Sequence, residues 1–127
     1  MILALLAILI VGPFKPDPTL TPGVTTSLTR AAICSTKWGK DARHVTLTMR
    51  KQVFAAYRIP YEKHALYELD HLVPRELGGA DDIRNLWPEP WSDAHKKDRA
   101  ENAANRALCR GEISLEAAQA QMKAWGR

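Results

Sequence analysis

The spacing of apolar residues along the chain predicts three helices. Residues 47–58 carry apolar side chains at helical intervals, and this helix ends before Pro60, because the residue before a proline disfavours helical geometry. A second helix is expected from an N-cap at Ser92 to Gly111, since serine and glycine are preferred at the two ends of a helix. Ser114 caps a third helix, whose apolar stripe consists of Leu115, Ala118, Met122 and Trp125.

The segment between the first two helices has the pattern of a short hairpin. Residues 67–73 alternate loosely between apolar and polar side chains, which is typical of a strand, and a glycine loop follows at 78–80. Residues 85–87 predict a brief returning strand, which Pro88 and Pro90 should stop because proline cannot donate to a sheet. The expected fold class is α+β, with a short β-hairpin plus a helix and with flanking helices.

The chain divides into three predicted parts. Residues 1–12 are apolar and signal-like, residues 13–29 form a proline-rich extended linker, and residues 30–127 form the folded domain. A chain of 127 residues has room for one domain with one modest core. The apolar fraction of 46% and the charged fraction of 25% are ordinary for a folded protein, so disorder is not expected.

The apolar run at the N-terminus predicts export. Met1–Val11 is too short for a membrane-spanning helix, which needs about 20 residues, so no stable membrane span is expected. Its length suits the apolar part of a secretory signal, and we expect a periplasmic or secreted protein. However, no Lys or Arg precedes the run, and Gly12-Pro13 is a poor cleavage site. A buried N-terminal strand or helix in a cytoplasmic protein is therefore the alternative.

The charge distribution favours a nucleic-acid partner. The net charge is +4, and residues 36–64 carry seven basic side chains against two acidic ones. Residues 94–127 carry seven against four, whereas residues 65–93 have two basic side chains against seven acidic ones. An acidic centre flanked by basic segments suits a cation site within a phosphate-binding surface. Charged helix faces exposed to solvent would give the same pattern.

Four polar residues between positions 70 and 95 have the chemistry of a metal-dependent hydrolase. Asp70 and His71 are adjacent, Asn85 follows His71 by 14 residues, and His95 comes ten residues later. A carboxylate and an imidazole can together bind a divalent cation. A second imidazole can act as a base near pH 7, because its unperturbed pKa is about 6.5. These are the groups needed for metal-assisted cleavage of a phosphodiester.

The segment from Glu68 to Arg110 resembles the HNH family of endonucleases, in the form of its small secreted or phage-borne members. The matching sequence is ELDHLVPRELGGADDIRNLWP, followed by His95. In that family, a β-hairpin and one helix surround a single metal ion, an arrangement called the ββα-metal fold. The resemblance implies this fold and a nuclease activity for the domain at 30–127.

Strand geometry separates the roles of the adjacent Asp70 and His71. Their side chains leave opposite faces of a strand, so both cannot bind one ion without distortion. We therefore expect Asp70 and His95 to bind the metal and His71 to act as the general base, and the resemblance implies the same roles. It also implies that the Asn85 amide, which both donates and accepts hydrogen bonds, spans the loop and fixes the hairpin.

Neighbouring charged residues complete the predicted site. Glu68 lies two residues before Asp70, on the same strand face, and is expected to support the metal ligand. Lys96, Lys97 and Arg99 lie on the following helix and are expected to contact phosphates of the nucleic acid. The alternative for all four charged side chains is an ordinary exposed surface position.

The two cysteines, Cys34 and Cys109, are 75 residues apart and form no C-x-x-C motif, which excludes a zinc knuckle. In an exported protein two lone cysteines of a small domain are expected to pair, so we predict a disulfide. Two separately buried thiols are the alternative if the protein stays in the cytoplasm.

These patterns predict an endonuclease that hydrolyses DNA with little sequence preference, with RNA left open as a substrate. One divalent metal ion is expected, and a site of one carboxylate and one imidazole leaves Mg, Mn, Ni and Zn open. The sequence contains no recognisable base-reading module such as a helix-turn-helix. A nucleic-acid-binding module that keeps the fold without the chemistry is the alternative, and the presence of all four polar residues weighs against it.

Overall fold

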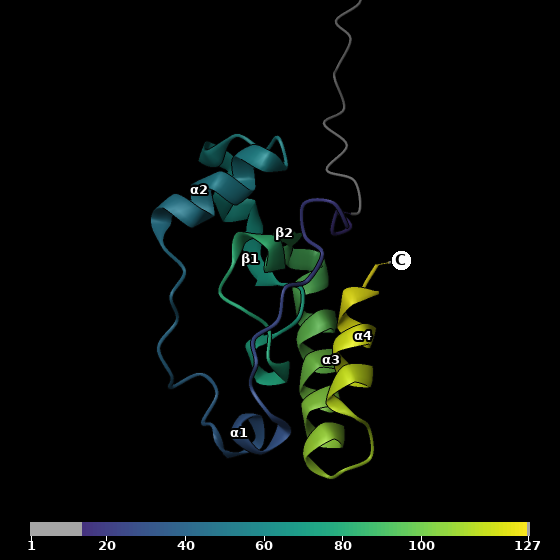
Figure 1. Cartoon of the computed structure of the whole chain (residues 1–127). Helices are drawn as coiled ribbons and strands as arrows, with labels where there is room; N and C mark the ends of the chain where they lie inside the picture. The colour runs from purple at the N-terminus through teal and green to yellow at the C-terminus, as the bar shows by residue number, and fades with distance from the viewer. Residues whose placement is uncertain (1–13, 127) are drawn as a thin grey trace, which may run out of the picture.

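Figure 1 shows the computed structural model of the chain, in which residues 14–126 are described. This part of the chain contains four α-helices, three short 3₁₀ helices (η) and one β-hairpin, and its fold class is α+β, as predicted. In chain order the elements are α1 (Arg30–Ser35), α2 (Leu47–Ala56), η1 (Tyr61–Leu66), β1 (Tyr67–His71), η2 (Arg75–Leu77), η3 (Ile83–Asn85), β2 (Leu86–Pro90), α3 (Trp91–Cys109) and α4 (Leu115–Lys123).

The hairpin of β1 and β2 is antiparallel, and these two strands form the whole sheet within residues 14–126. β2 begins at Leu86 and continues through Pro88, so the predicted stop at Pro88 is wrong, but the strand does end at Pro90. The two prolines are two residues apart and therefore share one edge of the strand. In a two-stranded sheet that edge can face away from β1, where a missing N–H group breaks no ladder hydrogen bond.

The helix after the hairpin, α3, begins two residues earlier than predicted. Pro90 precedes it without a side-chain cap, and Trp91 is its first residue, so Ser92 lies inside the first turn and not at the cap. The C-terminal end agrees with the prediction. α3 ends two residues before Gly111, which has a φ of +75° and thus the left-handed conformation that favours glycine after a helix.

The other two predicted helices are present. α2 covers most of 47–58, and the hydroxyl of its N-cap, Thr46, accepts from the Met49 amide at 3.1 Å. α4 has the predicted cap, in which the Ser114 hydroxyl accepts from the Ala117 amide at 3.0 Å. The sequence did not reveal α1 or the 3₁₀ helices, because a helix of three to six residues is too short to show an apolar period.

Two apolar clusters hold the helices around the hairpin. In Figure 1, α3 and α4 lie side by side, and the hairpin lies between them and α2. The first cluster joins α1, η2, α3 and α4 and contains Ile33, Val73, Leu77, Ala104, Leu108, Ala118 and Met122. The second joins α2 to β1 and contains Phe54, Ile59 and Tyr67. The second cluster therefore supports the hairpin directly through Tyr67, and the first supports the segment after β1 through Val73 and Leu77.

Residues 14–29, which were predicted to be a linker, are extended but packed against the domain. Thr21 is fully buried, and its hydroxyl donates to the carbonyl of Leu86 at 3.0 Å. Thr25 forms a β-bridge with Gly79 in the loop between the strands. Proline excludes a helix but leaves the neighbouring extended backbone free to pair, so composition alone does not separate a linker from such a packed segment.

The predicted disulfide between Cys34 and Cys109 is present, with a Cα–Cα distance of 5.6 Å. It joins α1 to the last residue of α3. A bond that closes a loop of this length stabilises a fold by about 4 kcal/mol in the chain-entropy model. Disulfides persist in oxidising surroundings, so this bond favours an oxidising location for the protein.

No helix in residues 14–126 is long and apolar enough to cross a membrane. The signal-like segment predicted at 1–12 lies outside the described residues.

Candidate functional site

Asp70 and His71 are adjacent in β1 and contact different partners. Asp70 is 6% exposed and accepts a hydrogen bond from the Trp87 indole N–H at 3.0 Å. His71 is 7% exposed and contacts Asp81, in the loop between the strands. Neither side chain is held by the other, so the two can have separate roles.

The His71 ring is held by Asp81. Nε2 of His71 lies 2.7 Å from Oδ1 of Asp81. Burial alone would raise the pKa of Asp81, but hydrogen bonds from the His44 amide and from His71, and the charge of Arg75, lower it. Asp81 is therefore an ionised carboxylate, which can only accept, so Nε2 carries the proton. In neutral His71 the lone pair on Nδ1 then remains for another proton.

The pKa of the His71 imidazole is lowered from its ordinary value, because burial disfavours the charged ring. Asp81 opposes this shift, since a carboxylate at hydrogen-bond distance stabilises the imidazolium. The result is a histidine that is neutral at pH 7 and has an anion beside it to stabilise a proton taken up during a reaction.

The Asn85 side chain ties the two ends of the loop that carries Asp81, which is the geometry expected for it. Asn85 is fully buried, and its amide oxygen accepts from the Val73 N–H at 3.0 Å. Its amide nitrogen donates to the carbonyls of Val73 at 2.9 Å and Ala80 at 3.0 Å. Gly79 packs so tightly in this loop that a Cβ there would lie 1.7 Å from the Val73 carbonyl oxygen.

Lys97 occupies a place that the sequence did not predict. The side chain is fully buried, and Nζ lies 2.8 Å from Oδ2 of Asp70 and 2.6 Å from Oε1 of Glu101. Nζ also donates to the His71 carbonyl at 2.9 Å. Burial lowers the pKa of Lys97, but the charges of Asp70 and Glu101 outweigh this and raise it. The predicted contact between Lys97 and phosphates is therefore wrong, because the ammonium faces the interior of the protein.

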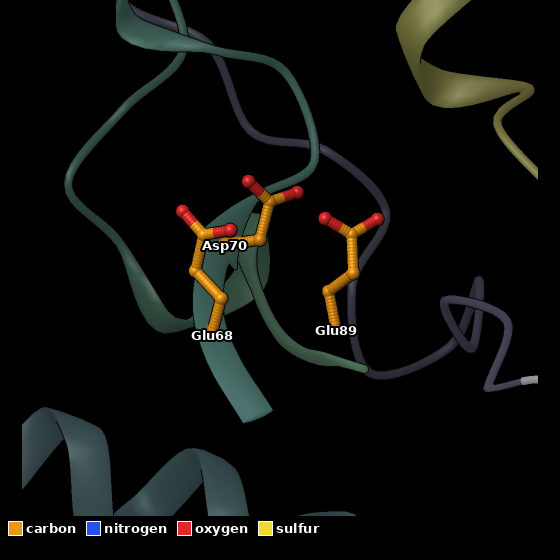
Figure 2. A group of neighbouring side chains, drawn as sticks. All are labelled: Glu68, Asp70 and Glu89. Carbon is orange, nitrogen blue, oxygen red and sulfur yellow. The ribbon is translucent and has the colours of Figure 1, made fainter. Parts of the chain in front are cut away.

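Three carboxylates gather on the Asp70 side of the hairpin. Glu68 and Asp70 come from β1, and Glu89, which pairs with Glu68 in the strand register, comes from β2. Figure 2 shows Asp70 between the two glutamates, with all three carboxylates on the same side of the strands. One oxygen of each lies within 4.8 Å of the others, so the group could hold a metal ion.

Burial perturbs both glutamates of this group. Glu89 is fully buried, and burial together with the negative charge of Asp70 raises its pKa to about 9. The same two causes raise the pKa of the half-buried Glu68 to about 7. Within residues 14–126, neither carboxylate oxygen of Glu89, nor Oε2 of Glu68, has a hydrogen-bond partner. A buried carboxylate without a partner is costly unless a proton or a cation neutralises it.

His95 does not lie beside Asp70. It is exposed on α3, whereas Lys97, two residues later, contacts Asp70. An α-helix turns about 100° per residue, so the two side chains point about 200° apart. The expected pair of Asp70 and His95 is thus replaced by the pair of Asp70 and Lys97. Lys96 and Arg99 are exposed on α3, as contact with a phosphate requires.

A cavity of about 270 Å³ opens at this end of β1. Asp70 and His71 both line it, together with Glu68 and the basic residues Arg43 and Arg75. The cavity therefore combines a histidine, carboxylates and guanidinium groups. Guanidinium groups can bind a phosphodiester, and a histidine can take the proton from an attacking water.

Asp81, Glu89 and Lys97 were missed by sequence reasoning, and two of them had a signal. Lys97 falls on the buried face of α3 with Ala94 and Ala104, since these positions follow the helical period. Glu89 is directly opposite Glu68 once the register of the hairpin is known. Asp81 had no signal beyond its residue type, because loop conformation decides which side chain reaches the histidine.

Comparison with known protein families, with curated proteins and with solved structures finds no match to this chain. The functional assignment rests on the groups that the site contains. These are a histidine with one ring nitrogen held by a carboxylate, three carboxylates able to hold a cation, and arginines in the same cavity.

Proposed function

We propose that this protein is a metal-dependent endonuclease of the HNH type, which hydrolyses phosphodiester bonds in DNA with His71 as the general base. The observation that carries the proposal is the His71–Asp81 pair beside Asp70, on a cavity that is also lined by Arg43. A general base that acts on a phosphodiester needs a neighbouring group that binds the phosphate and a positive charge that stabilises the transition state. In the cavity, Arg43 can bind the phosphate, and Asp70 can help to hold a cation.

In this proposal, Nδ1 of His71 removes a proton from the attacking water. Asp81 keeps the other ring nitrogen protonated and stabilises the imidazolium that forms, as a carboxylate does for a catalytic histidine in other hydrolases. Asn85 acts as a positioning residue, because its three hydrogen bonds fix the loop that carries Asp81.

The residues on the Asp70 side fit a divalent cation. Glu89 is fully buried with two oxygens that lack a partner in the described part of the chain, and a cation would satisfy them. When bound, such an ion supplies Lewis-acid stabilisation of negative charge on the phosphate and on the leaving oxygen. The proposed function does not distinguish among Mg, Mn, Ni and Zn ions.

Basic side chains near the site support a nucleic-acid substrate. Arg43 is exposed and lines the cavity, and Lys96 and Arg99 are exposed on α3. Lysine and arginine bind the phosphate backbone without reading sequence, which fits an enzyme with little sequence preference. The disulfide supports the proposal that the enzyme acts after export, in the periplasm or outside the cell.

The test is nicking of supercoiled plasmid DNA by the purified, oxidised protein with and without divalent metal. His71→Ala should lower the rate by about 10²- to 10⁴-fold and leave DNA binding intact, because a general base contributes that much. His64→Ala is the control, since His64 stacks on Tyr61 and does not line the cavity, and it should cleave normally. Binding of DNA without cleavage by the wild type would favour the inactive binding module instead, and cleavage of RNA alone would change the substrate.

A further inference from the structure

We propose that Glu68, Asp70 and Glu89 bind one hard divalent cation, Mg²⁺ or Mn²⁺, through carboxylate oxygens alone and without a histidine ligand. The inference deepens the proposed function by naming the ligands and the class of ion. It rests on the proposed function for the use of the ion, but not for its binding.

Glu89 provides the strongest observation. The side chain has no exposed surface, it lies beside two other carboxylates, and neither of its oxygens meets a donor among residues 14–126. A buried anion without a partner costs several kcal/mol, so something must neutralise it. A cation held between the three carboxylates would neutralise Glu89 and would also satisfy Oε2 of Glu68.

Lys97 cannot neutralise Glu89 or Glu68 through a direct hydrogen bond. An ammonium has three donor hydrogens, and the three contacts of Lys97 go to Asp70, Glu101 and the carbonyl of His71. No hydrogen is left for either glutamate. When Glu68, Asp70, Glu89 and Glu101 are all ionised, one ammonium leaves an excess of negative charge, which a divalent ion would reduce.

Asp70 has an oxygen available for the ion. The contacts from Lys97 and from the Trp87 indole are both made to Oδ2, so Oδ1 can take a further ligand. Glu68 lines the cavity, which gives the ion a route from solvent and leaves coordination positions for water or a phosphate oxygen. The ligands come from adjacent strands in fixed register, so the site is held by the hairpin itself.

The composition of the site selects the ion. Carboxylate oxygens suit Mg²⁺, Mn²⁺ and Ca²⁺, whereas Zn²⁺ and Ni²⁺ favour imidazole and thiolate ligands. The exposed His95 on the far side of α3 contributes nothing to this group, so the ligand set differs from the pair of Asp70 and His95 expected from the sequence.

The experiment measures Mn²⁺ binding to the EDTA-treated protein by the electron paramagnetic resonance signal of the free ion. One Mn²⁺ per chain is expected, displaced by Mg²⁺. Glu89→Gln and Glu68→Gln should each weaken binding by at least about tenfold, because each removes a charged ligand. His95→Ala and Glu112→Gln should bind as the wild type does, since both residues are exposed and lie outside the group.

The test uses two glutamate variants because a substitution at the buried Glu89 could prevent folding, whereas one at the half-buried Glu68 disturbs the fold less. Glu89→Gln nearly preserves the shape of the side chain, and Glu68→Gln changes a residue that is only half-buried. Circular dichroism identifies the folded variants. No Mn²⁺ binding by the wild type, unchanged binding by folded Glu68→Gln, or a loss with His95→Ala equal to that with Glu89→Gln would each overturn the proposal. Mn²⁺ binding without nuclease activity would support this site and refute the proposed function.

Discussion

Raising the pH from 7 to 9 should destabilise the metal-free protein, and Glu89 is the reason. The pKa of Glu89 in the folded protein is about 9, against an ordinary value of 4.5. Between these values the folded state holds a proton that the unfolded state has lost, so the free energy of unfolding falls as the pH rises. The limiting slope is about 1.4 kcal/mol per pH unit, and the loss from pH 7 to pH 9 is about 2 kcal/mol.

This pH range isolates the buried carboxylates from the other titrating groups. The pKa of Asp81 is lowered from 3.8 and that of His71 is lowered from 6.5, so both pKa values in the folded protein lie below this range. The pKa values of Tyr57 and Lys97 are raised above their ordinary values of 10.0 and 10.5. Glu68 and Glu101, each with a pKa of about 7, add losses of the same sign at the start of the range.

Urea unfolding followed by tryptophan fluorescence measures the effect, in EDTA and at several pH values from 7 to 9. Glu89→Gln should remove most of the pH dependence, because the amide does not titrate. Addition of Mg²⁺ should flatten the wild-type curve, since a bound cation replaces the proton. Equal pH dependence for the wild type and Glu89→Gln would show that Glu89 is not the group responsible, and a flat wild-type curve in EDTA would refute its raised pKa.

Three further predictions concern the loop and the disulfide. Asp81→Asn should slow DNA cleavage at least about tenfold and shift the acid limb of the pH–rate profile to lower pH, because loss of the anion lowers the pKa of His71. Replacing Cys34 and Cys109 by serine should cost about 4 kcal/mol in thermal or urea unfolding, and thiol titration of the denatured, unreduced wild type should find no free thiol. Gly79→Ala should cost at least about 3 kcal/mol, or prevent folding, because its Cβ would clash with backbone.

Each of these predictions has a control. For the loop, Gly39→Ala places a Cβ in open space at a φ of +91° and should cost only about 1 kcal/mol of backbone strain. Similar losses for Gly39→Ala and Gly79→Ala would argue against the tight packing of the loop. For the histidine pair, a rate loss in Asp81→Asn without any shift of the pH profile would indicate a structural effect. Detection of two free thiols in the wild type would show that the disulfide does not form.

Local sequence patterns predicted the features of this fold that depend on neighbouring residues. The separate contacts of Asp70 and His71 agree with the two-residue period of a strand, and the cap at Ser114 follows from side-chain chemistry. The disulfide followed from the count of cysteines together with the expectation of export. None of these needs knowledge of how distant elements pack.

The errors concern packing between elements. Whether His95 or Lys97 meets Asp70 depends on the rotation of α3 about its axis, and two residues change that rotation by about 200°. The helical period groups Lys97 with Ala94 and Ala104, but the charge of a lysine favours an exposed position. The burial of Lys97 is explained by its ion pairs with Asp70 and Glu101, which depend on how α3 packs against the hairpin.

The packed segment at 14–29 has a consequence for where this domain can be cut. Any shortened version that starts at residue 30 would lose the Thr21 hydroxyl from the Leu86 carbonyl and the bridge between Thr25 and Gly79. These contacts cover the same loop that positions the partner of the proposed base. A shortened domain that keeps these contacts must include Thr21, and it must start by Phe14 to keep the ring of Phe14 against Tyr67 of β1.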